Sequence, residues 1–162
     1  MPVSWGKPLV TFPTTVPVIP HAAWHLDIDG ATRLSPLPTL RTFTFLEPVL
    51  PHGGGTLCVS GSHRLAIEIE RTHGGPVKSA QVRDRLAADH PWFASLLDTP
   101  LASLRALIGV EARAGAHPVR LEEMTGAPGE LVIMHPALLH GVAHNARERP
   151  RLMLTEWISR RT

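Results

Sequence analysis

The chain has 162 residues, with 16 lysines and arginines against 14 acidic residues, so its net charge is only +2. Because the basic residues are scattered, we expect no nucleic-acid partner. The single cysteine, Cys58, excludes an internal disulfide and a cysteine-based zinc site. No apolar run is long enough to span a membrane, and the first residues lack a signal-peptide core, so we expect a cytoplasmic protein.

The predicted elements are mostly short strands in one domain, residues 1–162. An edge strand lies within 8–19, and a second short strand runs into 24–27. Further strands cover 40–50, 56–60, 117–124, 131–135 and 151–158. Residues 64–70 either extend their strand or bend away from it, and 72–76 form a loop. The 16 prolines favour many turns, so the pattern predicts a β-sandwich or jelly roll.

Helical spacing occurs in one region only. Val82, Leu86, Trp92, Phe93, Leu96 and Leu97 recur at intervals typical of a helix, with a break near Pro91. One or two further helical turns follow over 101–108. We therefore predict a short helical insertion at about 78–109.

His25 and Asp27 form a candidate metal-binding pair. Residues two apart on a strand share one face, so Leu26 would point the other way. His140, just beyond the apolar strand 131–135, is the best third ligand. Two imidazoles and one carboxylate form a facial triad suited to Fe(II), whereas a closed zinc site needs a fourth protein ligand. His52, His63, His135 and His144 compete with His140 for this role.

Arg151 is a candidate anion-binding residue. It opens the last predicted strand, which would return antiparallel beside its predecessor and aim the guanidinium into the cavity of the metal. A buried guanidinium calls for a carboxylate or phosphate partner. The alternative is a surface arginine paired with Glu148 or Glu156.

Three segments together carry a resemblance. WHLDIDG (24–30), LRTFTFLEPVLPHGGGTLCVSGSHR (40–64) and GAPGELVIMHPALLHGVAHNARERPRLML (126–154) resemble the phytanoyl-CoA dioxygenase family of Fe(II)- and 2-oxoglutarate-dependent oxygenases. The resemblance implies a double-stranded β-helix, the cupin-like jelly roll. It also implies hydroxylation of a small-molecule substrate with release of succinate and CO₂.

The resemblance further implies individual roles. His25, Asp27 and His140 would hold iron, and Arg151 would bind the far carboxylate of 2-oxoglutarate, with Arg147 and Arg149 as alternatives. Thr44 would either contact this cosubstrate or be a plain strand residue. Gly61, Ser62 and His63 match a turn of the family, for which we expect a structural role.

The region before the metal ligands is shorter than in the family. Only 24 residues precede His25, where relatives carry a longer helical region, and the flank left exposed would make a homodimer plausible. Two other functions stay open. One is a zinc-dependent hydrolase with the carboxylate of Glu47 or Asp29 as its general base. The other is a shortened binding protein without catalysis.

Overall fold

The computed structural model describes residues 6–15, 24–36 and 39–159. Its strands are β1 (Lys7–Thr11), β2 (Thr39–Phe45), β3 (Leu57–Ser60), β4 (Glu111–Ala114), β5 (His117–Glu123), β6 (Leu131–Met134), β7 (His140–Gly141) and β8 (Arg151–Ser159). Its helices are α1 (Ser62–His73), α2 (Ser79–Asp89), α3 (Pro91–Asp98) and α4 (Leu101–Leu104), followed by the 3₁₀ turn Arg105–Leu107.

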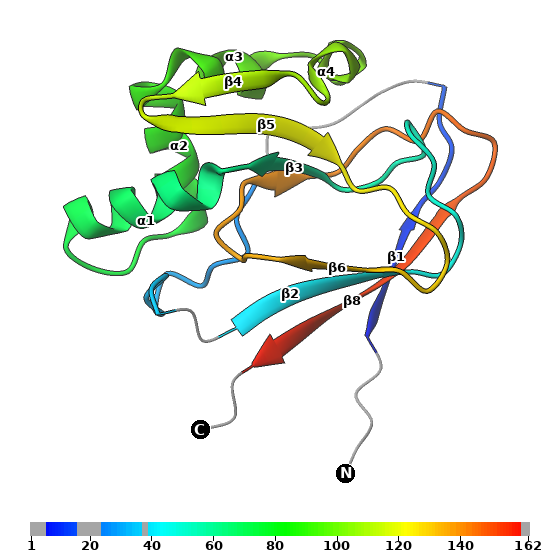
Figure 1. The fold of residues 1–162 in the computed structure, drawn as a ribbon, viewed down its shortest axis with the longest axis horizontal. Coiled ribbons are helices and arrows are strands. Elements are labelled where there is room, and N and C mark those ends of the chain that lie inside the picture. The colour runs from blue at the N-terminus through cyan, green and yellow to red at the C-terminus, as the bar shows by residue number, and fades with distance from the viewer. Residues whose placement is uncertain (1–5, 16–23, 37–38, 160–162) are drawn as a thin grey trace.

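The strands form two four-stranded antiparallel sheets, ordered β1-β8-β2-β6 and β4-β5-β3-β7. The two sheets face each other, and the helices gather beside and above the second one (Figure 1). This arrangement confirms the predicted fold, a mainly β, cupin-like jelly roll with a helical insertion.

Alternate side chains of β2 form part of the inner face of the first sheet. Arg41, Phe43 and Phe45 point inward, and Phe45 is paired in register with Met153 of β8. Phe45 and Met153 are at most 1% exposed. Burying such a side chain contributes about 1.5 to 3 kcal/mol, so this small apolar cluster fixes the register of the strands.

The outer face of the same sheet remains apolar and open. Val10, Leu40, Leu131, Ile133 and Ile158 are each at least 36% exposed there. Among the described residues, no helix covers this face (Figure 1). The homodimer considered above stays a prediction.

The helical region begins earlier than predicted. Residues 64–70 were expected to extend a strand or bend away, yet they belong to α1, which starts at Ser62. The letters LAIEIE alternate as a strand would, but Gly61 has φ 88° and ends β3 in a left-handed turn. A Cβ at Gly61 would lie 2.3 Å from the carbonyl oxygen of Pro118, so only glycine fits.

The helices and the second sheet share one large apolar core. Val82, Leu86, Phe93 and Leu96, which the sequence analysis singled out, are each at most 1% exposed. They belong to one cluster with residues of β3 and β5, including Val59. None of the helices described is long and apolar enough to cross a membrane.

The segment that carries His25 and Asp27 is anchored to the helices. Leu26 and Leu34 are buried in the same core, and the Leu26 amide donates to Ser79 Oγ at 2.8 Å. The Leu34 amide donates to the buried Glu70 carboxylate at 2.9 Å. Leu26 therefore points away from its two neighbours, as predicted. The second strand expected to run into 24–27 is not formed there, because these residues make only an isolated bridge at His25. Residues 16–23 of the two expected strands lie outside the described residues.

Candidate metal centre

His25 and His140 are held together by the backbone. Each donates its amide to the other's carbonyl, with N–O distances of 2.9 Å, in an isolated antiparallel bridge. Residues paired in this way have side chains on the same face. The ring centroids lie 4.2 Å apart.

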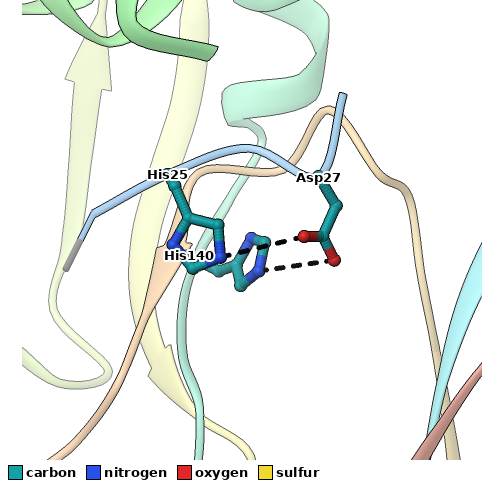
Figure 2. A group of neighbouring side chains, drawn as sticks. All are labelled: His25, Asp27 and His140. Carbon is teal, nitrogen blue, oxygen red and sulfur yellow. Dashed lines mark ion pairs between the residues drawn. The ribbon is translucent and has the colours of Figure 1, made fainter. Parts of the chain in front are cut away.

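Asp27 completes the group (Figure 2). Its amide donates to the Pro136 carbonyl at 2.9 Å, which fixes the backbone beside the loop leading to His140. One carboxylate oxygen lies 3.8 Å from His25 Nε2 and the other lies 3.6 Å from His140 Nε2. The structure therefore brings together all three residues predicted as metal ligands.

The donor atoms of these residues have room for one ion. One ligand atom from each residue can be chosen so that all lie within 4.8 Å of one another. A transition metal with ligand bonds of about 2.1 Å needs ligand atoms roughly 3 to 3.5 Å apart, so small side-chain rotations suffice. Among the described residues no fourth such ligand joins the group, so other coordination positions would be left open.

The imidazole of His140 is oriented for metal binding. Its Nδ1 lies 3.0 Å from the Leu138 carbonyl oxygen and donates to it, so Nε2 keeps its lone pair toward Asp27. Burial lowers the pKa of His140, and His25 and Arg41 lower it further, against opposing effects of Leu138 and Asp27. The neutral ring, which is the form that binds metals, is thereby favoured.

Ser62 ties the helical turn to the strand of His140. Its hydroxyl donates to the Val59 carbonyl at 2.7 Å and accepts from the Leu139 amide at 2.9 Å. The side chain is fully buried. The predicted structural role of the Gly61–Ser62–His63 turn is thus to brace the residue that precedes His140.

Cys58 lies opposite His140 in the β3–β7 pair. Burial raises the pKa of its thiol to about 12, with Glu122 adding to the effect. A thiol with this pKa stays protonated at neutral pH and is a poor metal ligand.

Arg41 also lies at this group, although its place there was not predicted from the sequence. Its Nε lies 3.4 Å from Asp27 Oδ2, and its guanidinium carbon lies 4.7 Å from the ring centroid of Trp157. The alternation of β2 had placed Arg41 on the same face as Phe43. The strand alternation could therefore have indicated that Arg41 points inward. That its guanidinium lies beside Asp27 follows only from the fold.

Arg151 is buried, with 6% exposure, on the inner face of β8. Its Nε donates to Thr11 Oγ1 at 3.0 Å, and Nη1 contacts Met153 Sδ at 3.0 Å. No carboxylate among the described residues lies within ion-pair distance of it, so the alternative pairing with Glu148 or Glu156 is not formed. Burial lowers its pKa.

The loop before Arg151 is organised by Asn145, which is fully buried. Its Nδ2 donates to the carbonyls of Thr11 and Arg149, at 3.0 and 2.8 Å. The guanidinium of Arg147 instead donates to the Pro51 carbonyl on the surface. Arg147 is therefore engaged elsewhere, and Arg149 is exposed, whereas Arg151 is buried.

Thr44 is not brought to the metal group. It lies on the face of β2 opposite Arg41, Phe43 and Phe45, and it pairs with Leu131 and Leu154 in neighbouring strands. Because side chains alternate along a strand, its hydroxyl points away from the space between the sheets. This position disagrees with the suggested cosubstrate contact and agrees with a plain strand residue.

The competing histidines lie in other contacts. His63 and His135 pair with each other, with ring centroids 5.1 Å apart. His52 lies beside Glu123, and His144 contacts Arg105. Within the described part of the chain, none of the four joins the group of His25, Asp27 and His140.

A cleft of about 460 Å³ opens beside Asp27. Its walls are mostly apolar, and the lining residues are Leu26, Asp27, Ile28, Asp29, Thr32, Arg33, Leu34, Thr39, Pro136 and Trp157. The Asp29 carboxylate accepts from the amides of Ala31 and Thr32, and these bonds lower its pKa. It is a loop carboxylate, and Glu47 lines a different cleft.

Comparisons with known proteins support the fold. No family model and no curated protein matches the chain. The solved structure of EvdMO1 resembles it with a TM-score of 0.52 and 14% identity, covering 96% of this chain and 26% of that one.

Two further solved structures are similar at TM-scores of 0.49 and 0.47. They are AviO1 from Streptomyces viridochromogenes Tue57 and an N-substituted L-amino acid dioxygenase from Burkholderia ambifaria AMMD. Their identities are 18% and 14%. The matches cover 94% and 96% of this chain, but only 48% and 49% of those proteins. The chain therefore spans between a quarter and a half of the structures it resembles.

Proposed function

We propose that this chain is an Fe(II)- and 2-oxoglutarate-dependent dioxygenase that hydroxylates a small-molecule substrate. The observation that carries the proposal is the convergence of His25, Asp27 and His140, whose ligand atoms lie within 4.8 Å of one another. The other half of the support is Arg151, a buried guanidinium without an acidic partner among the described residues.

The donor set fits Fe(II). Two neutral imidazoles and one carboxylate form the arrangement that leaves coordination positions open for a cosubstrate and O₂. The Leu138 carbonyl fixes the tautomer of His140, and the Pro136 carbonyl fixes the backbone of Asp27. These contacts supply the orientation that metal ligands normally receive from neighbouring groups.

The cosubstrate also has a suitable partner. Arg151 lies on the inner face of the first sheet, the face that also carries Arg41, and its contact with Met153 turns the guanidinium along the strand. A guanidinium without an acidic partner is costly to bury and favours a dianion such as 2-oxoglutarate. Thr11 Oγ1 accepts from Arg151 and holds it in place.

When bound, iron and 2-oxoglutarate supply the oxidising chemistry, in which O₂ is consumed and succinate and CO₂ are released. The residues of the chain bind, orient and neutralise charge. Asp27 would offset part of the ion's charge, and His25 and His140 would hold the ion with it. The apolar cleft next to Asp27 holds the substrate and limits access of water.

The test is formation of succinate from 2-oxoglutarate by the purified protein with Fe(II), with and without candidate substrates. His25→Ala is expected to abolish metal-dependent turnover while leaving a folded chain, because the His25 side chain is 47% exposed. The matched control is His73→Ala, an exposed histidine at the end of α1.

Each of the two alternative functions predicts a different experimental result. Hydrolysis with zinc but no succinate with iron would replace the proposal by a zinc hydrolase, although Asp29 is already engaged by its own turn. No uptake of iron, manganese or zinc in calorimetry would replace it by a binding protein.

A further inference from the structure

The guanidinium of Arg41 has hydrogen-bonding capacity that the described residues leave unused. It lies between Asp27 Oδ2, 3.4 Å from its Nε, and the ring of Trp157. Its Nε is buried without a hydrogen bond, and no hydrogen bond joins its other nitrogens to any described residue. A guanidinium offers five donors in a planar fork, and a buried one usually meets a carboxylate with two of them.

Charge at the metal site also calls for an anion beside Arg41. A divalent ion brings two positive charges and the guanidinium one, and Asp27 removes one, so the three together carry a charge of +2. Arg41 is only 15% exposed, so water screens this charge weakly. Arg151 adds another buried positive charge on the same inner face of the sheet. The two charges of 2-oxoglutarate leave an excess.

The cleft supplies the rest of a ligand site. Asp27 and Trp157, the two neighbours of Arg41, both line it. Most of the other walls are apolar, including Leu26, Leu34 and Pro136. Its own arginine, Arg33, donates to the Gly74 carbonyl at 3.0 Å and lies on an exposed loop. Arg41 is not itself a lining residue, but it contacts two of them, Asp27 and Trp157, so an acid group at that part of the cleft wall would be within reach of its guanidinium.

We propose that Arg41, stacked on Trp157, binds the carboxylate of the substrate, while the apolar remainder of that substrate lies in the cleft. The substrate class is thus an amphipathic carboxylic acid. That the bound acid is a substrate rests on the proposed oxygenase function. Binding of a carboxylic acid at Arg41 does not require turnover, so it is tested separately.

The experiment is calorimetric titration of the zinc-loaded protein with 4-phenylbutyrate and with its neutral amide. We expect the acid to bind at least about tenfold more tightly than the amide, the effect of a charge-assisted hydrogen bond. Arg41→Gln should remove this preference. Arg41→Lys, which keeps the charge but loses the fork, should retain part of it.

Three controls locate the effect. Arg33→Gln should keep the full preference, because Arg33 already bonds to Gly74. Trp157→Phe should keep the preference with weaker binding. Titration with 2-oxoglutarate distinguishes the carboxylate site at Arg41 from the one at Arg151. The Arg151→Gln variant should no longer bind 2-oxoglutarate, whereas the Arg41→Gln variant should still bind it.

Equal binding of acid and amide, or no binding of either, would overturn the proposal. It would also be overturned if Arg41→Gln lost 2-oxoglutarate but still preferred the acid probe. Absence of succinate formation together with an Arg41-dependent acid preference would instead refute the oxygenase and leave the carboxylate site standing.

Discussion

His25 and His140 exchange both backbone hydrogen bonds, at 2.9 Å in each direction, although one lies near the start of the chain and the other near its end. Their ring centroids are 4.2 Å apart. The paired backbone therefore sets the two imidazoles side by side. Ligands positioned by backbone hydrogen bonds lose less conformational freedom when they bind an ion, which lowers the cost of binding.

The first prediction separates the two histidines by stability. His25→Ala and His140→Ala should both lose metal binding in calorimetry. In the metal-free protein, His140→Ala should lower the free energy of unfolding by about 1 to 3 kcal/mol, because His140 is buried and donates to Leu138. His25→Ala should change it by roughly 0.5 kcal/mol or less, since the side chain is half exposed.

Urea unfolding at neutral pH with a chelator present measures both effects. Tight metal binding by either variant would contradict the assignment of the ligands. Equal destabilisation by both would contradict the difference in burial on which the prediction depends.

The second prediction concerns Ser62, which joins the β3–α1 turn to the strand of His140. Ser62→Ala removes a donor to Val59 and an acceptor for Leu139, and both partners are buried. We expect a loss of about 1 to 3 kcal/mol in the free energy of unfolding, together with weaker metal binding. Ser60→Ala, two residues earlier and exposed, is the matched control and should change stability by roughly 0.5 kcal/mol or less. A variant as stable as the control would show that the two hydrogen bonds do not matter.

The three residues that converge, His25, Asp27 and His140, were predictable because a His-x-Asp triplet and a distant histidine have the types and spacing suited to one metal ion. Four other histidines competed for the third position, and Arg151 was favoured over Arg147 and Arg149 only by the family resemblance. The strands of the first sheet were equally visible, since β2 alternates apolar and polar residues and contains no glycine or proline.

Other features depended on tertiary contacts that a linear pattern does not encode. Residues 65–70 alternate like a strand, but the left-handed turn at Gly61 starts a helix whose buried face includes Leu65 and Glu70. Arg41 was recognised only as a strand residue, because its meeting with Asp27 requires a loop and a sheet to converge. The burial of Glu70 likewise depends on a tertiary contact, because its carboxylate accepts a hydrogen bond from the Leu34 amide.

The third prediction uses the burial of Arg151. A buried guanidinium without an acidic partner destabilises a fold, and its lowered pKa has the same cause. Arg151→Met keeps much of the side-chain volume, so it should raise the free energy of unfolding by about 1 kcal/mol or more while abolishing 2-oxoglutarate binding. Arg147→Met, which removes an exposed arginine, should leave both quantities nearly unchanged.

Thermal unfolding and calorimetric titration with 2-oxoglutarate check this pair of effects. A variant that is less stable than the original protein would show that Arg151 serves the fold through Thr11 rather than a ligand. Unchanged 2-oxoglutarate binding would remove Arg151 from the proposed site.

The fourth prediction concerns acid sensitivity at the pair His63 and His135. Burial lowers the pKa of His135 to about 4, with His63 adding to the effect, and burial also lowers the pKa of His63. Between pH 6.5 and 4 the unfolded chain therefore binds a proton at residue 135 that the folded chain does not. The contribution of neutral His135 to the free energy of unfolding is therefore fully present above about pH 6.5, and it is lost as the pH falls toward 4.

His135→Asn keeps an acceptor for the Ala137 amide, which His135 Nδ1 accepts at 3.1 Å, but it cannot titrate. The variant should therefore lose less stability than the original protein when urea unfolding at pH 7.5 is compared with pH 5. His73→Asn, at an exposed histidine, should follow the original protein. If His135→Asn showed the same fall in unfolding free energy as the original chain, the acid sensitivity would have to come from groups other than this histidine pair.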